Sequence, residues 1–200
     1  ARDEGLLVAR VHTGDPAIYG ATAEQRELLR RLGVAYESIP GVSAFSAAAA
    51  RSDVEITLPE VSQSLILTRL EGGRTPMPPR ESVREFAAHG TTMALYLSAA
   101  RSHTLQQELL AGGYPPDTPV IIGHQVTWPD EVMVRCRLDQ LAATMKEHKF
   151  WKHTVILVGP ALAETPLAKR SHLYHPGFRH EYRDADPVAA RELAEKGAQA

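Results

Sequence analysis

The stretch of this chain with the clearest chemical character is VHTGDPAIYGA at residues 11–21, where Gly14, Asp15 and Pro16 directly follow an apolar run. A glycine turn at the carboxyl end of a buried strand lets backbone N–H groups and a helix N-terminus converge on a ligand. Asp15 would repel a phosphate, and the sequence has neither the P-loop spacing nor the three-glycine dinucleotide fingerprint. Residues 11–21, which we call the first corner, therefore predict a site for a ligand with a positive group, such as an amino acid moiety or a sulfonium.

Two further features accompany this corner. Gly20 falls inside the helix that Asp15 and Pro16 are expected to start, and a helical glycine costs about 1 kcal/mol relative to alanine. Either a ligand or a neighbouring backbone segment must then approach Gly20 closely, and the spacing favours neither. PGVSAFSAAAA at 40–50, which we call the second corner, contains a turn of the same kind. Its small residues fit either a ligand or close helix packing.

The elements that must position these corners follow from hydrophobic periodicity. An apolar run at 6–11, a helical pattern at 21–32, a second apolar run at 34–39 and a helix beginning after Ser43 predict a parallel α/β layer. The remaining apolar runs predict five more strands, at 64–70, 91–98, 118–126, 131–138 and 153–159. Helical patterns separate most of these runs, at 80–88, 101–111 and 138–148.

These elements predict an α/β fold with two α/β domains. The first domain would occupy residues 1–59 with a parallel sheet, and the second residues 60–183. WPDE at 128–131 resembles a hairpin turn, so the second sheet is expected to be mixed. Residues 184–200 form a charged, alanine-rich tail that is expected to be a loose helix or disordered.

Composition narrows the class of protein. The 22 basic residues nearly balance the 24 acidic ones, so no nucleic-acid or membrane-surface partner is expected. The sequence contains no run as apolar and long as a membrane span, and nothing at its start that reads as a signal peptide. Cys136 is the single cysteine, which excludes an internal disulfide. A cytoplasmic enzyme or binding domain is the expectation.

Other groups with chemical potential carry weaker signals. Arg74 lies in the loop EGGRTPMPP at 71–79, which suits a lid over an anionic substrate but equally an ordinary surface loop. His172, His175 and His180 lie close together, yet Pro176 and Gly177 break any helix among them, so no metal site is predicted. Cys136 has no paired base in the sequence pattern, and covalent catalysis is not expected.

Several of these segments together resemble the S-adenosylmethionine-dependent tetrapyrrole methylases. The resemblance runs from about residue 6 to residue 183 and includes VHTGDPAIYGA, PGVSAFSAAAA, QSLILTRLEGGRTPMP, TWPDE and LYHPGFRHEYR. It is strongest to the branch that methylates carbon 11 of precorrin-4 or cobalt-precorrin-4 during cobalamin synthesis. The family implies two α/β domains, a homodimer, a tetrapyrrole substrate, no metal, and S-adenosylhomocysteine as the product of the donor.

The resemblance also implies site residues. Gly14, Asp15, Ile18 and Tyr19 of the first corner would contact S-adenosylmethionine together with Ser43 and Ala44 of the second corner. Leu97 and Ala161 would close the pocket from the other domain. Because the substrate carries many carboxylates, we expect arginines to hold it, with three candidates: Arg69, Arg74 and Arg101. No catalytic base is assigned.

One family segment has no counterpart in these residues. Family members begin with a strand and a Gly-Pro-Gly-Asp-Pro loop, so the first sheet is expected to be truncated at its N-terminal side. Two alternatives therefore stay open beside the methyltransferase: a non-catalytic fragment that binds cofactor or dimerises, and a sister methylase acting at another ring carbon.

Overall fold

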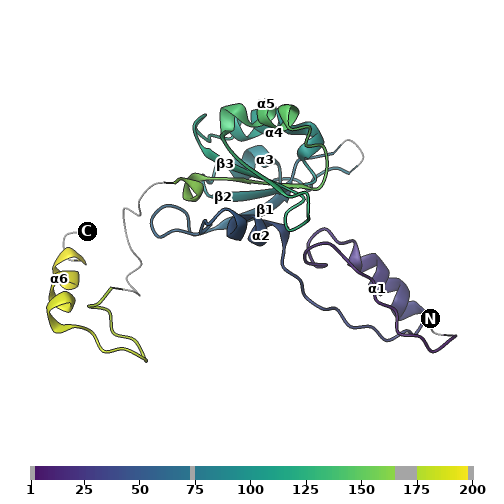
Figure 1. Cartoon of the computed structure of the whole chain (residues 1–200), viewed down its shortest axis with the longest axis horizontal. Coiled ribbons are helices and arrows are strands. Elements are labelled where there is room, and N and C mark those ends of the chain that lie inside the picture. The colour runs from purple at the N-terminus through teal and green to yellow at the C-terminus, as the bar shows by residue number, and fades with distance from the viewer. Residues whose placement is uncertain (1–2, 73–74, 165–174, 198–200) are drawn as a thin grey trace.

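The computed structural model describes residues 3–72, 75–164 and 175–197, and its centre is a five-stranded sheet (Figure 1). The strands follow the spatial order β1-β2-β5-β3-β4. Their bounds are β1 (Leu65–Arg69), β2 (Thr92–Tyr96), β3 (Pro119–His124), β4 (Val132–Arg137) and β5 (Thr154–Val158). All five lie within runs that the sequence predicts as strands.

The sheet is mixed, as expected. Only β1 and β2 are parallel, while β5 runs antiparallel to both β2 and β3, and β3 to β4. The register pairs Met93 with Val158 across β2 and β5, and Ile122 with Ile156 across β3 and β5. This order brings the carboxyl ends of β2 and β3 and the amino end of β5 to one edge of the sheet.

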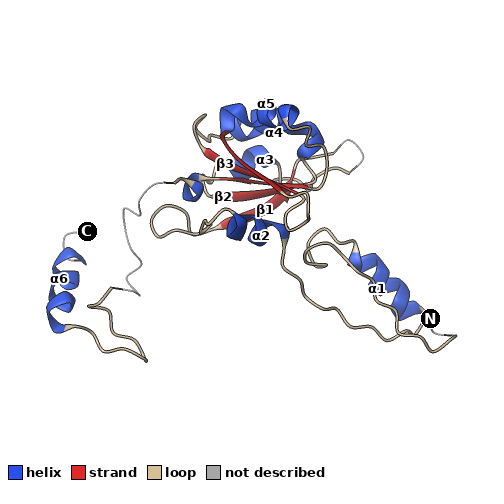
Figure 2. Ribbon diagram, viewed as in Figure 1, coloured by secondary structure: helices blue, strands red, loops and turns tan. Residues whose placement is uncertain are grey.

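Helices cover both faces of this sheet (Figure 2). The described residues form the helices α1 (Thr22–Arg31), α2 (Ala44–Arg51), α3 (Val83–Ala87), α4 (Ser102–Ala111), α5 (Leu141–Glu147) and α6 (Pro187–Gly197). Of these, α2 packs on one face of the sheet and α3, α4 and α5 on the other. The same part of the chain also contains 3₁₀ turns at Ala99–Arg101, Leu138–Gln140 and Pro160–Leu162. No helix in the described part of the chain is long and apolar enough to cross a membrane.

The two faces bury separate cores because successive strand side chains alternate between them. Leu95 and Ile156 face α3, α4 and α5, and each such fully buried side chain contributes about 1.5–3 kcal/mol. Ala94 and Leu157 face the other way, against Ala48 of α2. The alanine-rich sequence of α2 lets its backbone lie close to the sheet, so this helix is fixed directly to the strands that border the candidate site.

The segment that carries α1 lies to one side of the sheet body (Figure 1). The strands predicted at 6–11 and 34–39 do not form: both segments have no strand pairing in the described residues, and Leu7, Val11 and Ile39 are exposed. An apolar run becomes a strand only when a neighbouring strand pairs its backbone N–H and C=O groups. The α/β class is confirmed, but the parallel first sheet is absent from the described residues.

The start of α1 differs from expectation, whereas the tail is helical, one of the two states expected for it. Helix α1 begins at Thr22 rather than at Asp15 and Pro16, because Tyr19 and Ala21 adopt left-handed backbone conformations with φ of 55° and 50°. At the other end of the chain the tail forms α6, whose first turn is capped by Asp186. The domain limits at residues 59 and 183 stay a prediction.

Candidate functional site

The first corner is built around the carboxylate of Asp15. Its Oδ1 accepts a hydrogen bond of 2.7 Å from the backbone N–H of Ala17, which closes a single turn. Gly14 has a φ of 67°, which L side chains rarely adopt. A Cβ on Gly20 would collide with the carbonyl of Pro16, so the local backbone alone requires glycine there. Of the two explanations for Gly20, close backbone approach is the one that the structure supports.

The two corners lie against each other. A Cβ on Gly41 would fall 3.1 Å from the carbonyl carbon of Gly14 and closer still to its oxygen, so the second glycine is required by contact with the first. The backbone N–H of Gly41 also donates to Oδ2 of Asp15 over 3.4 Å. Asp15 therefore binds backbone groups of both corners and sets their separation.

Tyr96, the last residue of β2, connects the corners to the sheet. Its hydroxyl accepts a hydrogen bond of 3.0 Å from the backbone N–H of Phe45 and lies 2.8 Å from Oγ of Ser43. Its ring lies 5.5 Å from the ring of Tyr19. Burial raises the pKa of the Tyr19 hydroxyl, and the nearby guanidinium of Arg69 partly offsets this increase. Tyr19 is thus a neutral hydrogen-bonding group rather than a charged one near neutral pH.

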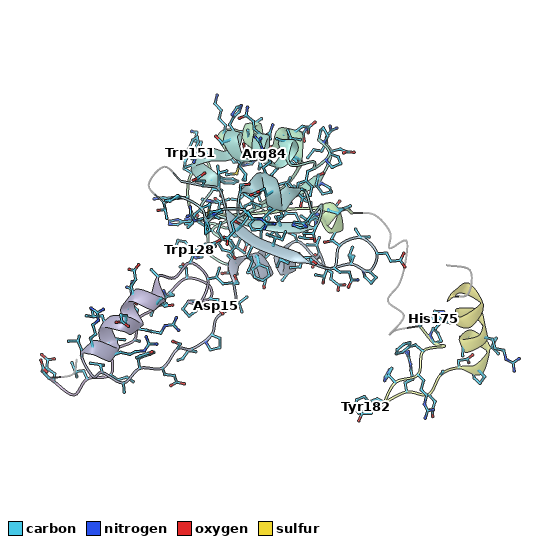
Figure 3. The ribbon with its side chains drawn as sticks, turned by 180° about the vertical axis from the view of Figure 1, so that it is seen from behind. Asp15, Arg84, Trp128, Trp151, His175 and Tyr182 are labelled. Carbon is cyan, nitrogen blue, oxygen red and sulfur yellow. The ribbon has the colours of Figure 1, made fainter. Side chains whose placement is uncertain are left out.

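These groups border a cavity of about 810 Å³ at the edge where β2 and β3 end and β5 begins. Figure 3 labels Asp15, Trp128 and Trp151, which lie along one side of the molecule and contribute to the cavity wall. The volume lies within the usual range for small-molecule sites, about 300–1,000 Å³. The cavity combines one carboxylate, several aromatic rings and small residues that leave the backbone accessible.

The backbone around the cavity is strained. Left-handed φ values between 48° and 69° occur at five non-glycine residues of its wall: Tyr19, Leu97, Gln125, Thr127 and His153. Such conformations cost about 1–3 kcal/mol each and cluster at binding and catalytic sites. Thr127 is the most unusual of them, because β-branched residues are rarely left-handed. The strain supports a functional role for this cavity.

The residues that the sequence assigns to the cofactor are largely brought together here. Seven of the eight line the cavity: Gly14, Asp15, Ile18, Tyr19, Ser43, Ala44 and Leu97. Ala161 is buried in the 3₁₀ turn after β5 and does not line the cavity.

Two of the three arginines predicted to hold substrate, Arg69 and Arg101, do not line this cavity. Arg69 donates hydrogen bonds to the carbonyl oxygens of Thr75 and Pro76, and Arg101 donates to the carbonyl of Glu71. Both side chains therefore hold the loop that follows β1. Arg74 lies outside the described residues, as does His172.

Sequence reasoning missed the part of the wall that comes from the C-terminal side of the sheet. Trp128 and His153 line the cavity with their rings 5.4 Å apart, and Trp151 and Lys152 lie beside them. His153 lies directly before β5 and is exposed to solvent while it lines the cavity. The tryptophan in TWPDE is the signal that could have identified this wall, because a large aromatic side chain in a turn has no core to fill there.

Two further titratable groups have shifted pKa values: His124 at the end of β3 and Cys136 in β4. Burial lowers the pKa of His124, and the neighbouring His153 lowers it further, so His124 is neutral at pH 7. Burial raises the pKa of the Cys136 thiol, which keeps it protonated within β4.

Known proteins match this chain over most of its length. The family model for tetrapyrrole (corrin/porphyrin) methylases matches residues 1–142. The cobalt-precorrin-4 C(11)-methyltransferase of Methanocaldococcus jannaschii is 45% identical over 183 residues, which span 92% of this chain and 70% of that protein. The precorrin-4 C(11)-methyltransferase of Pseudomonas aeruginosa is 45% identical over 186 residues, 93% of this chain and 73% of that protein.

Solved structures of known proteins also match the fold of this chain. The X-ray structure of a cobalt precorrin-4 methyltransferase superimposes with a TM-score of 0.78 at 45% identity, covering 80% of this chain and 67% of that one. A uroporphyrin-III C-methyltransferase from Thermus thermophilus, complexed with S-adenosylhomocysteine, shows the same fold with a TM-score of 0.61 at 24% identity, over 74% of this chain and 64% of that one. The chain therefore belongs to the tetrapyrrole (corrin/porphyrin) methylase family.

Proposed function

We propose that this protein transfers the methyl group of S-adenosylmethionine to carbon 11 of precorrin-4 or cobalt-precorrin-4 in cobalamin biosynthesis. The observation that carries the proposal is the cavity wall in which Asp15 and the two glycine corners meet the ends of β2 and β3. Identity of 45% to relatives named for this reaction gives the substrate class. The chain would act in the cytoplasm as a homodimer.

The chemistry of the wall fits the donor. S-adenosylmethionine, when bound, supplies an electrophilic methyl group on a sulfonium and leaves as a neutral thioether. The carboxylate of Asp15 is a suitable partner for that positive group or for the donor's amino group. Tyr19 and Trp128 provide aromatic faces for a nucleobase or for a cation.

The protein's contribution to the reaction is positioning. The nucleophile is an electron-rich carbon of the substrate ring, so no side chain of this chain has to form a bond to it. Holding the reacting atoms about 3–3.5 Å apart and in line contributes as much as about 7–11 kcal/mol toward the barrier. Tyr96 and Asp15 fix the corners that would hold the donor, and the surrounding rings would exclude water from the transfer.

In this proposal, arginines bind the substrate. Arg69 and Arg101 bind the carbonyl oxygens of Thr75, Pro76 and Glu71, and Arg74 lies between these residues in the sequence. Such guanidinium groups would bind the carboxylates of the tetrapyrrole with paired hydrogen bonds.

Two measurements on one sample test the proposal. Calorimetry gives the affinity of the chain for S-adenosylhomocysteine, and mass spectrometry follows methylation of precorrin-4 and of cobalt-precorrin-4 in the presence of the donor. Binding together with one added methyl group at carbon 11 supports the proposal. Binding without turnover indicates a cofactor-binding fragment, methylation at another carbon indicates a sister enzyme, and the absence of binding refutes the site itself.

A further inference from the structure

Glu131 forms a bridge between two walls of the cavity. Its Oε1 lies 2.6 Å from the guanidinium of Arg51, at the end of α2, and its Oε2 accepts a hydrogen bond of 2.6 Å from the backbone N–H of Thr127. The side chain of Glu131 is only 12% exposed, whereas that of Arg51 is 58% exposed. Both carboxylate oxygens are therefore engaged, each with a different element.

The backbone that Glu131 holds is the strained turn between β3 and β4. Gln125 and Thr127 have φ values of 48° and 69°, and Gln125, Thr127 and Trp128 all line the cavity. Backbone hydrogen bonds from Trp128 to Gln125, 2.9 Å, and from Glu131 to Trp128, 3.1 Å, close the turn on itself. A conformation of this cost persists only where surrounding contacts enforce it, and the carboxylate supplies the contact at Thr127.

Arg51, at the other end of the bridge, is also held firmly by the fold. Arg51 is the last residue of α2, whose Ala48 is fully buried against the sheet. The first turn of the same helix begins at Ala44, which lines the cavity beside the second corner. The ion pair thus sets the distance between the turn that carries Trp128 and the helix that carries Ala44.

We propose that Glu131 is a positioning residue, whose carboxylate holds the Gln125–Trp128 turn in the conformation that receives the methyl donor. The inference rests on the proposed function, because it takes the donor to occupy this cavity. The carboxylate acts through the turn and touches neither donor nor substrate. Hydrogen bonds from Arg51 first, and then from the N–H of Thr127, stabilise the ionised form, so the pKa of Glu131 is lowered and the group stays charged across the physiological range.

The test compares donor affinity with fold stability in a set of variants of the full chain. Glu131→Ala removes both contacts, and Glu131→Gln keeps an acceptor for the N–H of Thr127 but loses the charge that pairs with Arg51. Arg51→Ala removes the partner, and the double variant closes a mutant cycle. Arg84→Ala is the matched control, because Arg84 makes a similar ion pair of 2.9 Å with Glu108 on the helices of the opposite face.

Calorimetry with S-adenosylhomocysteine and thermal unfolding are the two readouts. If the released turn is in the receptive conformation about a tenth of the time, Glu131→Ala binds about tenfold more weakly than the wild type. We expect Glu131→Gln to be intermediate, the double variant to be no weaker than Glu131→Ala, and Arg84→Ala to stay within about twofold of the wild type. Trp128 fluorescence in a Trp151→Phe background should become more accessible to acrylamide in Glu131→Ala.

Three results separate the inference from the function beneath it. Wild-type binding with unchanged affinity in Glu131→Ala overturns the positioning role and leaves the proposed function intact. Additive losses in the double variant also overturn it, because independent effects exclude a shared bridge. A wild-type chain that does not bind S-adenosylhomocysteine overturns the proposed function instead.

Discussion

Replacing Gly41 with alanine is expected to separate the two corners that form the Asp15 side of the cavity. The backbone of Gly41 does not have a positive φ, so alanine costs nothing through local conformation. The added methyl would instead lie 3.1 Å from the carbonyl carbon of Gly14, whereas carbon atoms in contact lie about 3.5–4.0 Å apart. It would be closer still to the Gly14 oxygen, so the corners must move apart by roughly 1 Å.

That movement determines how much ligand affinity and turnover the variant loses. It breaks the hydrogen bond from the N–H of Gly41 to Asp15, already long at 3.4 Å, and displaces the carboxylate from the donor. The bond within the chain is long and exposed, so its loss costs little stability. The larger loss is the contact between the displaced carboxylate and the donor: a hydrogen bond to a charged group contributes about 1.5–3 kcal/mol, so affinity for S-adenosylhomocysteine should fall by about tenfold or more. A displacement of about 1 Å at the reacting centre lowers turnover by about 100-fold.

The assay is the methyl-transfer rate under kcat/KM conditions, with calorimetry on the same preparation and Gly90→Ala as the control. Gly90 has a φ of 61°, and no atom lies within 4 Å of the position that an added methyl would take. Alanine there costs about 1–2 kcal/mol of stability through the backbone alone, without touching the cavity. Gly41→Ala should lose turnover with little loss of stability. Gly90→Ala should lose stability with little loss of turnover. Turnover within about threefold of the wild type in Gly41→Ala would refute the reasoning.

The same site yields three other predictions. Asp15→Asn keeps the acceptor for Ala17 but removes the charge, so calorimetry should show binding of S-adenosylmethionine weakened about fivefold more than binding of its neutral product. Tyr96→Phe leaves the N–H of Phe45 without its partner, which should cost about 1 kcal/mol in urea unfolding and lower product affinity about fivefold. Because the pKa of folded His124 is depressed, the unfolded chain binds protons more readily, so stability should be constant above the ordinary value of 6.5 and decline as pH falls below it.

Each of these has a contrary outcome. Equal losses for sulfonium and thioether in Asp15→Asn would show that charge plays no part in recognition. Unchanged binding in Tyr96→Phe would remove the link between the second corner and β2. For His124, denaturant midpoints at about pH 7.5 and about pH 5.5 should differ less in His124→Gln than in the wild type, and an equal difference would assign the pH dependence to another group.

Much of the sheet could be predicted from the sequence because its strands are continuous apolar runs bounded by turn residues. TVILV at β5 and TMALY at β2 are buried on both faces or nearly so, and a short continuous apolar run between turn residues is typical of such strands. The mixed topology followed from one hairpin signal at 128–131. The runs at 6–11 and 34–39 have the same appearance, yet pairing depends on neighbouring strands that local sequence does not describe.

The residues of the candidate site also fall into those that could be predicted from the sequence and those that could not. Gly14 and Asp15 lie in a corner whose turn chemistry is visible locally, so a ligand site there could be predicted, whereas the place of Ser43 in the cavity wall was implied only by the family resemblance. Trp128 and His153 reach the cavity because β5 runs between β2 and β3, which brings the turn after β3 beside the start of β5. That adjacency is a property of strand order, and no local pattern in the sequence reports it.

A crystal structure of the chain with S-adenosylhomocysteine tests the central claim most directly. We expect the sulfur of the ligand to lie in the cavity between the Asp15 corner and Leu97, with Trp128 on the opposite wall. A ligand bound elsewhere on the chain, with only solvent beside Asp15, would contradict it.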